Sequence, residues 1–319
     1  MKQKEILLFG ASGQIGRNLI RKLSKNDYKI TAVTRNIHQA GYILKTQANP
    51  GYLELAEIKN FNSDKIDELM KNCSLCINLI GILHEKKRDE FKLIHSDLPN
   101  LLSKKANKFK IEKFIHLSSL GIEKALDSKY AKSKLDGEKK ILGNFKRSII
   151  LKPSIVYSVD DKFTTNFMTL LNRLPIMPLY YNGSTKFSPI HVSDIVEIIF
   201  QMIENQNESL IMECIGPEVM SFKEILKELL NSIDKKRLLL PLPKPIASLT
   251  AKFLQLLPKP LLTEDQLKLL KYDNIKSGLY KTNFDLGFKT NRTFKTEVDK
   301  YSYNWKSGGQ YASKKNIVN

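Results

Sequence analysis

Gly10-Ala-Ser-Gly13-Gln-Ile-Gly16 is the motif that most clearly indicates the fold of this 319-residue chain. It follows an apolar run at residues 5–9 and opens a segment with helical spacing at residues 16–24. Glycines so placed form the phosphate-binding turn of a dinucleotide fold. A side chain at Gly10 would block the tight turn, one at Gly13 would strike a pyrophosphate, and one at Gly16 would push the helix off the sheet. The stretch therefore predicts a nicotinamide dinucleotide site.

The start of the helix that follows this turn is expected to bind the phosphates of the dinucleotide. Its first N–H groups have no partner within the helix and carry a partial positive charge, which favours bound phosphate. The other residues of the turn that we expect to contact the dinucleotide are Ser12, Gln14 and Ile15.

The end of the second predicted strand discriminates between the two dinucleotides. An acidic side chain there would bind the ribose 2'-OH of NAD and repel the 2'-phosphate of NADP. This chain has Thr34-Arg35-Asn36 instead. Arg35 could form a forked, charge-assisted contact with that phosphate, and Arg17 could add to it. We therefore expect NADP(H), with NAD(H) as the alternative, because both arginines would also suit an exposed surface.

Alternating strand and helix patterns predict an α/β fold with a doubly wound parallel sheet of the Rossmann type. The expected strands are at residues 5–9, 29–34, 51–55, 75–80, 113–117 and 148–152, and the expected helices are at 16–24, 63–71, 90–108 and 129–142. Residues 1–155 form the predicted dinucleotide-binding domain.

Residues 156–319 predict a smaller C-terminal α/β lobe for a substrate or a partner, with parts of 187–216 returning to the main sheet. Its expected elements are a proline-rich loop at 174–178, strands at 187–191 and 209–214, and helices at 194–204, 222–233 and 246–257. The last of these helices would lie against a membrane surface or a partner subunit, or would cap the core of the lobe.

Tyr130 and Lys134 lie four residues apart and so on one face of a predicted helix. A neighbouring ammonium favours the ionised phenol, so we expect the pKa of Tyr130 to fall and the pair to exchange a proton with a carbonyl or alcohol. The spacing is weak evidence, because Tyr272 and Tyr311 also precede a lysine by four residues. Position distinguishes Tyr130, which follows a strand ending at Leu117-Ser118-Ser119, at the edge that would face the dinucleotide.

The chain carries a net charge of +19, and its basic excess is densest near the C-terminus, where residues 231–319 have 17 basic and 7 acidic side chains. Such a field attracts anionic lipid, an acidic protein or nucleic acid, although a solvated lysine-rich surface explains it equally well. No zinc finger, RNA-binding signature or recognition-helix pattern is present, so we expect no nucleic-acid partner.

No run approaches the length of about 20 apolar residues that crosses a bilayer, so we expect no transmembrane segment. The start of the chain leads directly into the first strand, without the pattern of a secretory signal, and this favours a bacterial cytoplasm. Three cysteines rule out a disulfide framework. Cys73 and Cys76 have half of a zinc-site spacing, but nothing completes the site, so we expect Cys76 to pack in the core and no metal to bind.

His191 lies beside Ser193 and Asp194 and could be read as part of a hydrolytic triad. The sequence lacks a nucleophile elbow of the Gly-x-Ser-x-Gly type, so a structural histidine is favoured. His84 and His95 lack the spacing of paired metal ligands.

The motifs GASGQIG, HLSSLG, YAKSK and LKPSIVY resemble those of the extended or atypical short-chain dehydrogenase/reductase superfamily over about the first half of the chain. Narrower blocks at residues 78–85, 187–194, 216–218 and 262–274 are similar to the nucleotide-binding accessory subunit of respiratory complex I (NADH:ubiquinone oxidoreductase) and its bacterial relatives. This second resemblance runs nearly the full length.

The resemblance implies roles for individual residues. Tyr130 and Lys134 match the catalytic pair, and Ser118 or Ser119 would supply the third catalytic group, although Ser119 precedes Tyr130 by only 11 positions, fewer than is usual in the extended branch. The remaining residues that would contact the dinucleotide are Asn78 to Gly81 at the ribose, Pro153 at the nicotinamide and Glu57 near the adenine.

The resemblance also implies a function. It predicts a stably bound, largely structural NADP(H) in a complex I accessory or assembly component, peripheral at the inner face of a bacterial plasma membrane. The alternative is an active NADP-dependent oxidoreductase or epimerase acting on a small or quinone-related substrate, with Tyr130 as the proton donor. A nucleotide-sensing regulator is a third hypothesis.

Overall fold

Eight parallel strands form the central sheet of the computed structural model, which describes residues 4–61, 63–204, 209–243 and 262–309. Their spatial order is β14-β11-β6-β5-β4-β1-β2-β3. The strands are β1 (Glu5–Phe9), β2 (Lys29–Thr34), β3 (Leu53–Glu57), β4 (Leu75–Asn78), β5 (Lys113–Leu117), β6 (Ser148–Pro153), β11 (Leu210–Cys214) and β14 (Lys281–Thr282). The chain order reverses between β1 and β4, so the carboxyl edge there is the expected site for a dinucleotide.

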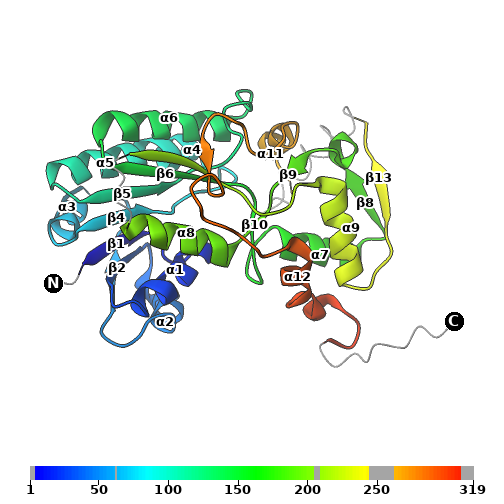
Figure 1. The fold of residues 1–319 in the computed structure, drawn as a ribbon, viewed down its shortest axis with the longest axis horizontal. Helices are drawn as coiled ribbons and strands as arrows, with labels where there is room; N and C mark the ends of the chain where they lie inside the picture. Colours follow the sequence, from blue (N-terminus) through cyan, green and yellow to red (C-terminus); the bar gives the residue numbers. More distant parts are fainter. Residues whose placement is uncertain (1–3, 62, 205–208, 244–261, 310–319) are drawn as a thin grey trace.

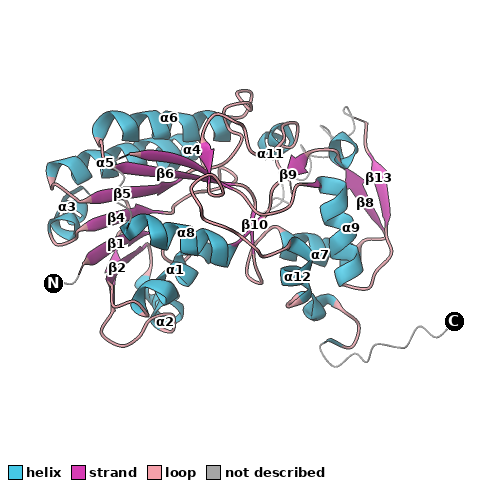
Figure 2. Ribbon diagram, viewed as in Figure 1, coloured by secondary structure: helices cyan, strands magenta, loops and turns pink. Residues whose placement is uncertain are grey.

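Helices cover both faces of this sheet (Figures 1 and 2). Successive side chains of a strand point to opposite faces. Ile6 and Leu8 accordingly join a core cluster with α1 (Gln14–Ser24) and α8 (Val192–Glu204). Leu7 and Phe9 join a second cluster on the other face, with α3 (Ser63–Lys71), α5 (Leu98–Lys108) and α6 (Lys129–Asn144). The predicted doubly wound α/β fold is confirmed.

Several details of this half differ from the predicted pattern, and β4 ends at Asn78, two residues earlier than expected. β3 begins two residues later than expected, because Gly51 has a φ of +85° and is still in a turn. The unpredicted α2 (Ile37–Lys45) is capped by Asn36, whose side chain accepts a hydrogen bond from the Gln39 N–H. The helix expected at 90–108 is α4 (Glu90–Lys92), a π-helical turn (Leu93–Asp97) and α5 in succession.

The small lobe has its own hydrophobic core and lies at the right of Figure 1. Its elements are β7 (Val156–Tyr157), α7 (Thr164–Arg173), β8 (Ile176–Leu179), β9 (Lys186–Phe187), β10 (Ile190–His191), β12 (Met220–Ser221), α9 (Phe222–Ser232), β13 (Leu238–Pro241), α11 (Glu264–Leu269) and α12 (Phe294–Asp299). Two short 3-10 turns, Tyr180–Gly183 and Ser302–Trp305, complete it.

The lobe corrects two expectations from the sequence. The expected loop at 174–178 is wrong in its second half, because β8 pairs in parallel with β13. Pro178 is compatible with this pairing since β8 has a single partner strand among the described residues and needs no second row of N–H donors. The strand expected at 187–191 is two short strands, β9 pairing with β12 and β10 with β7.

The strand expected at 209–214 is β11, which joins the main sheet beside β6. The helix expected at 246–257 lies outside the described residues. Among the residues that are described, none of the helices is long and apolar enough to cross a membrane.

Candidate functional site

The glycine turn connects β1 to α1 through close contacts between backbone segments. Gly10 has a φ of +81°, and a Cβ there would lie 2.9 Å from the carbonyl carbon of Leu79. A Cβ at Gly16 would lie 2.5 Å from the carbonyl oxygen of Gly10. Gly13 is the N-cap residue of α1 and provides no side-chain cap, so the first N–H groups of the helix are left for an anion. The turn therefore fits a dinucleotide.

A loop from the small lobe lies against this turn. The Gln14 amide donates to the Ser158 hydroxyl at 2.8 Å. Arg17 forms an ion pair with Asp160, and its guanidinium also donates to the carbonyl of Ser12 at 3.3 Å. Arg17 is thus engaged with a carboxylate, which argues against the additional role at a 2'-phosphate considered for it. Ile15, by contrast, packs partly against the main core.

Arg35 and Glu57 lie at the ends of neighbouring strands, where the adenosine half is expected. Arg35 is exposed and has no ion-pair partner among the described residues. The Glu57 carboxylate accepts a hydrogen bond from the Ile37 N–H at 2.9 Å and pairs with Lys59 at 3.1 Å. These contacts, the backbone bond first, lower the pKa of Glu57. Glu57 therefore fixes the start of α2, whereas Arg35 is available to a ligand.

The residues predicted near the nicotinamide ribose lie together at the carboxyl edge of the sheet. Asn78 is buried, and its amide lies 3.1 Å from Nδ1 of His116 while its oxygen accepts from the Ile80 N–H at 3.1 Å. A Cβ at Gly81 would lie 3.5 Å from Nζ of Lys134. Pro153, the last residue of β6, accepts a hydrogen bond at its carbonyl from the Leu120 N–H at 3.0 Å.

Tyr130 and Lys134 lie one turn apart on α6, as predicted. Nζ of Lys134 donates to the carbonyl of Leu117 at 3.0 Å and lies 6.0 Å from the centre of the Tyr130 ring. Burial lowers the pKa of Lys134 to about 8. Burial also raises the pKa of Tyr130, which is 8% exposed, although the nearby Ser119 side chain opposes this rise. The expected lowering of the phenol's pKa is therefore wrong, because desolvation outweighs the neighbouring cation.

The two candidate serines face different partners. The Ser119 side chain lies near the Tyr130 phenol and acts to lower its pKa. Ser118 is hydrogen-bonded to the buried carboxylate of Glu138, which pairs with Nζ of Lys152 at 2.7 and 2.8 Å. Ser119 is thus the serine placed to act with Tyr130, and Ser118 belongs to a buried charge network.

His95 completes the surroundings of Tyr130 and was considered from the sequence only as a metal ligand. Nε2 of His95 accepts from the Ile82 N–H at 3.1 Å, so the proton is on Nδ1, which lies 3.0 Å from the Ser133 hydroxyl. Burial lowers its pKa to about 2. The ring meets that of Tyr130 edge to face, with centroids 5.1 Å apart. His95 lies within the π-helical turn Leu93–Asp97, and a regular helical pattern gives no sign of such a turn.

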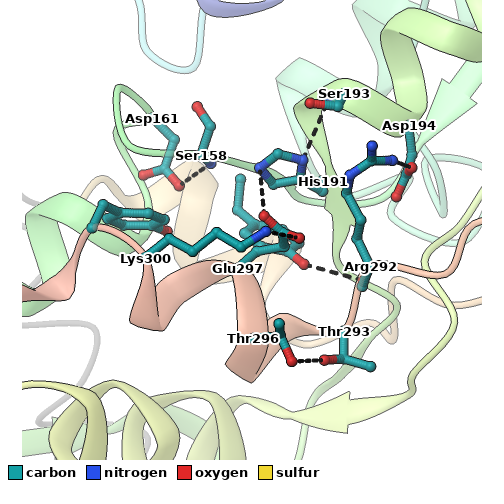
Figure 3. Close-up of polar contacts among 12 residues, drawn as sticks. Ser158, Asp161, His191, Ser193, Asp194, Arg292, Thr293, Thr296, Glu297 and Lys300 are labelled. Carbon is teal, nitrogen blue, oxygen red and sulfur yellow. Dashed lines mark hydrogen bonds and ion pairs between the residues drawn. The ribbon is translucent and has the colours of Figure 1, made fainter.

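His191, on β10, lies in a separate polar cluster that also includes Glu297 of α12 (Figure 3). Nδ1 of His191 accepts from the backbone N–H of Ser193 at 3.3 Å, and Nε2 lies 3.9 Å from the Glu297 carboxylate. Asp194 pairs with Arg292 instead of His191. Burial lowers the pKa of His191 to about 4. The contacts are those of a structural histidine, since the hydroxyl of Ser193 is not its partner.

Known proteins resemble the chain in sequence and in fold. The model of the NAD dependent epimerase/dehydratase family matches residues 6–213. The mitochondrial NADH-ubiquinone oxidoreductase 40 kDa subunit of Neurospora crassa is 25% identical over 288 residues, covering 88% of this chain and 74% of the relative. The mitochondrial NADH dehydrogenase 1 alpha subcomplex subunit 9 of Arabidopsis thaliana is 24% identical over 247 residues, covering 76% and 61%.

Among solved structures, the dTDP-glucose 4,6-dehydratase of Bacillus anthracis, in complex with NAD, superposes with a TM-score of 0.71 at 14% identity, covering 95% of this chain and 96% of that one. At this identity the likeness concerns the fold. The resemblance to complex I accessory subunits that the motifs predicted is confirmed by the sequence matches.

Proposed function

Because the chain belongs to the NAD dependent epimerase/dehydratase family, we propose that it binds a nicotinamide dinucleotide, NADP(H) in preference to NAD(H), as a largely structural ligand. The observation that carries the proposal is the glycine turn, where a Cβ at Gly10 or Gly16 would meet backbone atoms at 3.0 Å or less. The backbone leaves no room for a side chain in the turn, and the helix start beside it is uncapped. Both features fit a bound pyrophosphate.

A role in respiratory complex I, as an accessory or assembly component, is the second part of the proposal. Its support is the similarity to the 40 kDa and alpha subcomplex subunits over most of this chain. The basic excess would favour contact with an anionic membrane surface or an acidic subunit, at the inner face of a bacterial plasma membrane. The nucleotide would stabilise the fold by binding only the native state.

One experiment tests ligand and partner together. The protein is purified from native membranes, its released nucleotide is identified by mass spectrometry, and the co-purifying proteins are identified in the same sample. NADP(H) and complex I subunits are the expected result. A protein that carries no nucleotide, and whose Tm does not rise on addition of NADPH, would contradict the structural-ligand proposal.

Arg35 provides the test of cofactor choice. We expect Arg35→Ala to weaken NADPH binding about tenfold and to leave NADH binding within about twofold, because only NADPH loses a charge-assisted contact. Calorimetric titration with both dinucleotides measures the two effects. Arg147→Ala, an exposed arginine beyond α6, is the matched control. Equal weakening of both dinucleotides would show that Arg35 does not recognise the 2'-phosphate.

An active oxidoreductase or epimerase is the second candidate, and the Tyr130, Lys134 and Ser119 arrangement favours it. When bound, the nicotinamide would supply or accept hydride. Tyr130 would then give a proton to the substrate oxygen, and Lys134, charged below a pKa of about 8, would stabilise the phenolate that is left.

Tyr130→Phe separates the two candidates. The ring contacts of Tyr130 with Phe91 and His95 do not need the hydroxyl, so we expect an unchanged Tm and an NADPH affinity within about twofold of the parent. If the nucleotide is structural, the variant also supports respiration in a strain that lacks the parent protein. Loss of respiration with intact NADPH binding would instead favour the enzyme. Tyr42→Phe, at an exposed tyrosine on α2, is the control.

A further inference from the structure

The residue block at 263–274, which begins one residue before α11, reaches across to the start of α6. The carboxylate of Asp265 accepts three hydrogen bonds, from the Ser128 hydroxyl at 2.7 Å, the Lys129 N–H at 2.8 Å and the Tyr130 N–H at 3.0 Å. The first N–H groups of a helix have no partner within it, and a negative charge is favourable there. Asp265 therefore caps the helix that carries Tyr130 and Lys134, from a point 135 residues along the chain.

The other end of the block joins three elements around the same edge of the sheet. The Asn274 amide donates to the carbonyl of Leu120 at 2.6 Å, and its side-chain oxygen accepts from the Ser154 hydroxyl at 2.6 Å. The carbonyl of Asn274 accepts from the Ser188 N–H, in the small lobe, at 3.2 Å. Leu120 follows β5 and Ser154 follows β6. Asn274 is therefore hydrogen-bonded to residues just beyond the ends of both strands, where the nicotinamide is expected.

The middle of the block covers the surroundings of the phenol. Leu269 and Tyr272 pack against the small apolar cluster that contains Tyr130, Phe91 and Ile122. The Gln266 amide also reaches the carbonyl of Leu83, beyond the end of β4, at 3.5 Å. Side chains from residues 263–274 thus pack against the apolar cluster that surrounds Tyr130.

We propose that residues 263–274 form a strap that locks the nicotinamide half of the dinucleotide in place, with Asp265 as its positioning residue. This inference rests on the proposed function, that a dinucleotide is bound at all. The strap forms hydrogen bonds with Tyr130, Leu120 and Ser154. These residues lie near Lys134, Ser119 and Pro153, which are expected to surround the nicotinamide half. It makes none of these contacts with the glycine turn or Arg35, which serve the pyrophosphate and adenosine half. Its effect is therefore confined to one half of the ligand.

The two halves of the ligand can be tested separately with NADPH and with adenosine 2',5'-bisphosphate, which lacks the nicotinamide half. We expect Asp265→Ala to speed NADPH release about tenfold, the size that the loss of an ordinary helix cap predicts. Release is followed by the loss of NADPH fluorescence after mixing with excess NADP+. Binding of the bisphosphate should stay within about twofold. Asp265→Asn, which retains an acceptor oxygen, should lie between Asp265→Ala and the parent.

A readout without nucleotide comes from amide hydrogen exchange. In the nucleotide-free protein, exchange at Lys129 and Tyr130 should accelerate in Asp265→Ala, since these N–H groups lose their acceptor. Lys268→Gln changes an exposed charge on the same short helix and should behave as the parent in every measurement. If Asp265→Ala does not fold, Asp265→Asn carries the comparison.

The outcomes separate failure of the strap from failure of the proposed function. Unchanged NADPH release in Asp265→Ala, with faster exchange at Tyr130, would make Asp265 a structural cap only and overturn the strap. Equal weakening of NADPH and of the bisphosphate would overturn it as well, because the effect would then be global. A parent protein that binds neither ligand would overturn the proposed function, and unchanged amide exchange would overturn the capping role itself.

Discussion

Replacing Lys152 with methionine should lower the free energy of unfolding by about 3 to 5 kcal/mol, the cost of breaking a buried ion pair from one side. Lys152 lies on β6 and is 0% exposed. Its Nζ contacts the Glu138 carboxylate at 2.7 Å and that of Glu123 at 2.7 Å. Methionine fills a similar volume but leaves two largely buried carboxylates without their cation. Urea unfolding at pH 7 measures the loss.

The loss in the free energy of unfolding should depend on pH, whereas a loss caused only by poorer packing would not. Burial raises the pKa of Glu138 above 4.5, and Lys152 opposes this. Without Lys152 the rise is larger, so above pH 4.5 the native state binds more protons than the unfolded state. Stability then falls as pH rises. The deficit of Lys152→Met should therefore be greater at pH 8 than at pH 5.

Two further variants serve as controls for this prediction. Lys140→Met removes a lysine that pairs with Asp136 on the surface of α6, where both side chains are substantially exposed, and should cost less than about 1 kcal/mol. Combining Lys152→Met with Glu138→Gln and Glu123→Gln removes the unpaired charges and should recover part of the loss. A Lys152→Met protein with the stability of the Lys140→Met control would contradict the assignment of Lys152 as a buried cation.

The fold could be predicted because its signals are local. β1, β2 and β5 have the bounds that their apolar runs predicted, and the glycine turn has its expected backbone. Each follows from periodicity or from sterics within a few residues. β8 and β13 could not be predicted, since their short apolar stretches form strands only by pairing with each other across the lobe.

The candidate site was predictable only in part, for the same reason. Tyr130 and Lys134 lie one turn apart whatever surrounds the helix, so their spacing places them. Which of two adjacent serines faces the phenol depends on the end of β5, and the roles of His95 and Asp265 depend on a π-helical turn and on a contact across 135 residues. Burial likewise reversed the expected shift in the pKa of Tyr130, and no local pattern reports burial of that kind.

The close approach of α6 to the π-helical turn leads to the second large prediction. A Cβ at Gly137 would lie 1.9 Å from the carbonyl oxygen of His95, closer than any real contact of this kind, so two backbones would have to separate. We expect Gly137→Ala to lower the free energy of unfolding by about 3 kcal/mol. Because the displaced turn carries His95, whose ring meets Tyr130, NADPH release should accelerate as well. Urea unfolding and the fluorescence assay measure the two effects.

Gly143, on the same helix, supplies a matched control that should change stability in the opposite direction. A Cβ there meets nothing within 4 Å, so Gly143→Ala gains only the better helix propensity of alanine and should stabilise the protein by about 0.5 to 1 kcal/mol. Both variants add the same methyl group to α6 and differ only in what it meets. If the two shifted stability equally, the contact between α6 and the turn at His95 would not be the constraint that positions Tyr130. Changes of opposite sign in the free energy of unfolding, with faster NADPH release in Gly137→Ala alone, would show that the absence of a side chain at Gly137 allows the π-helical turn to lie close to Tyr130.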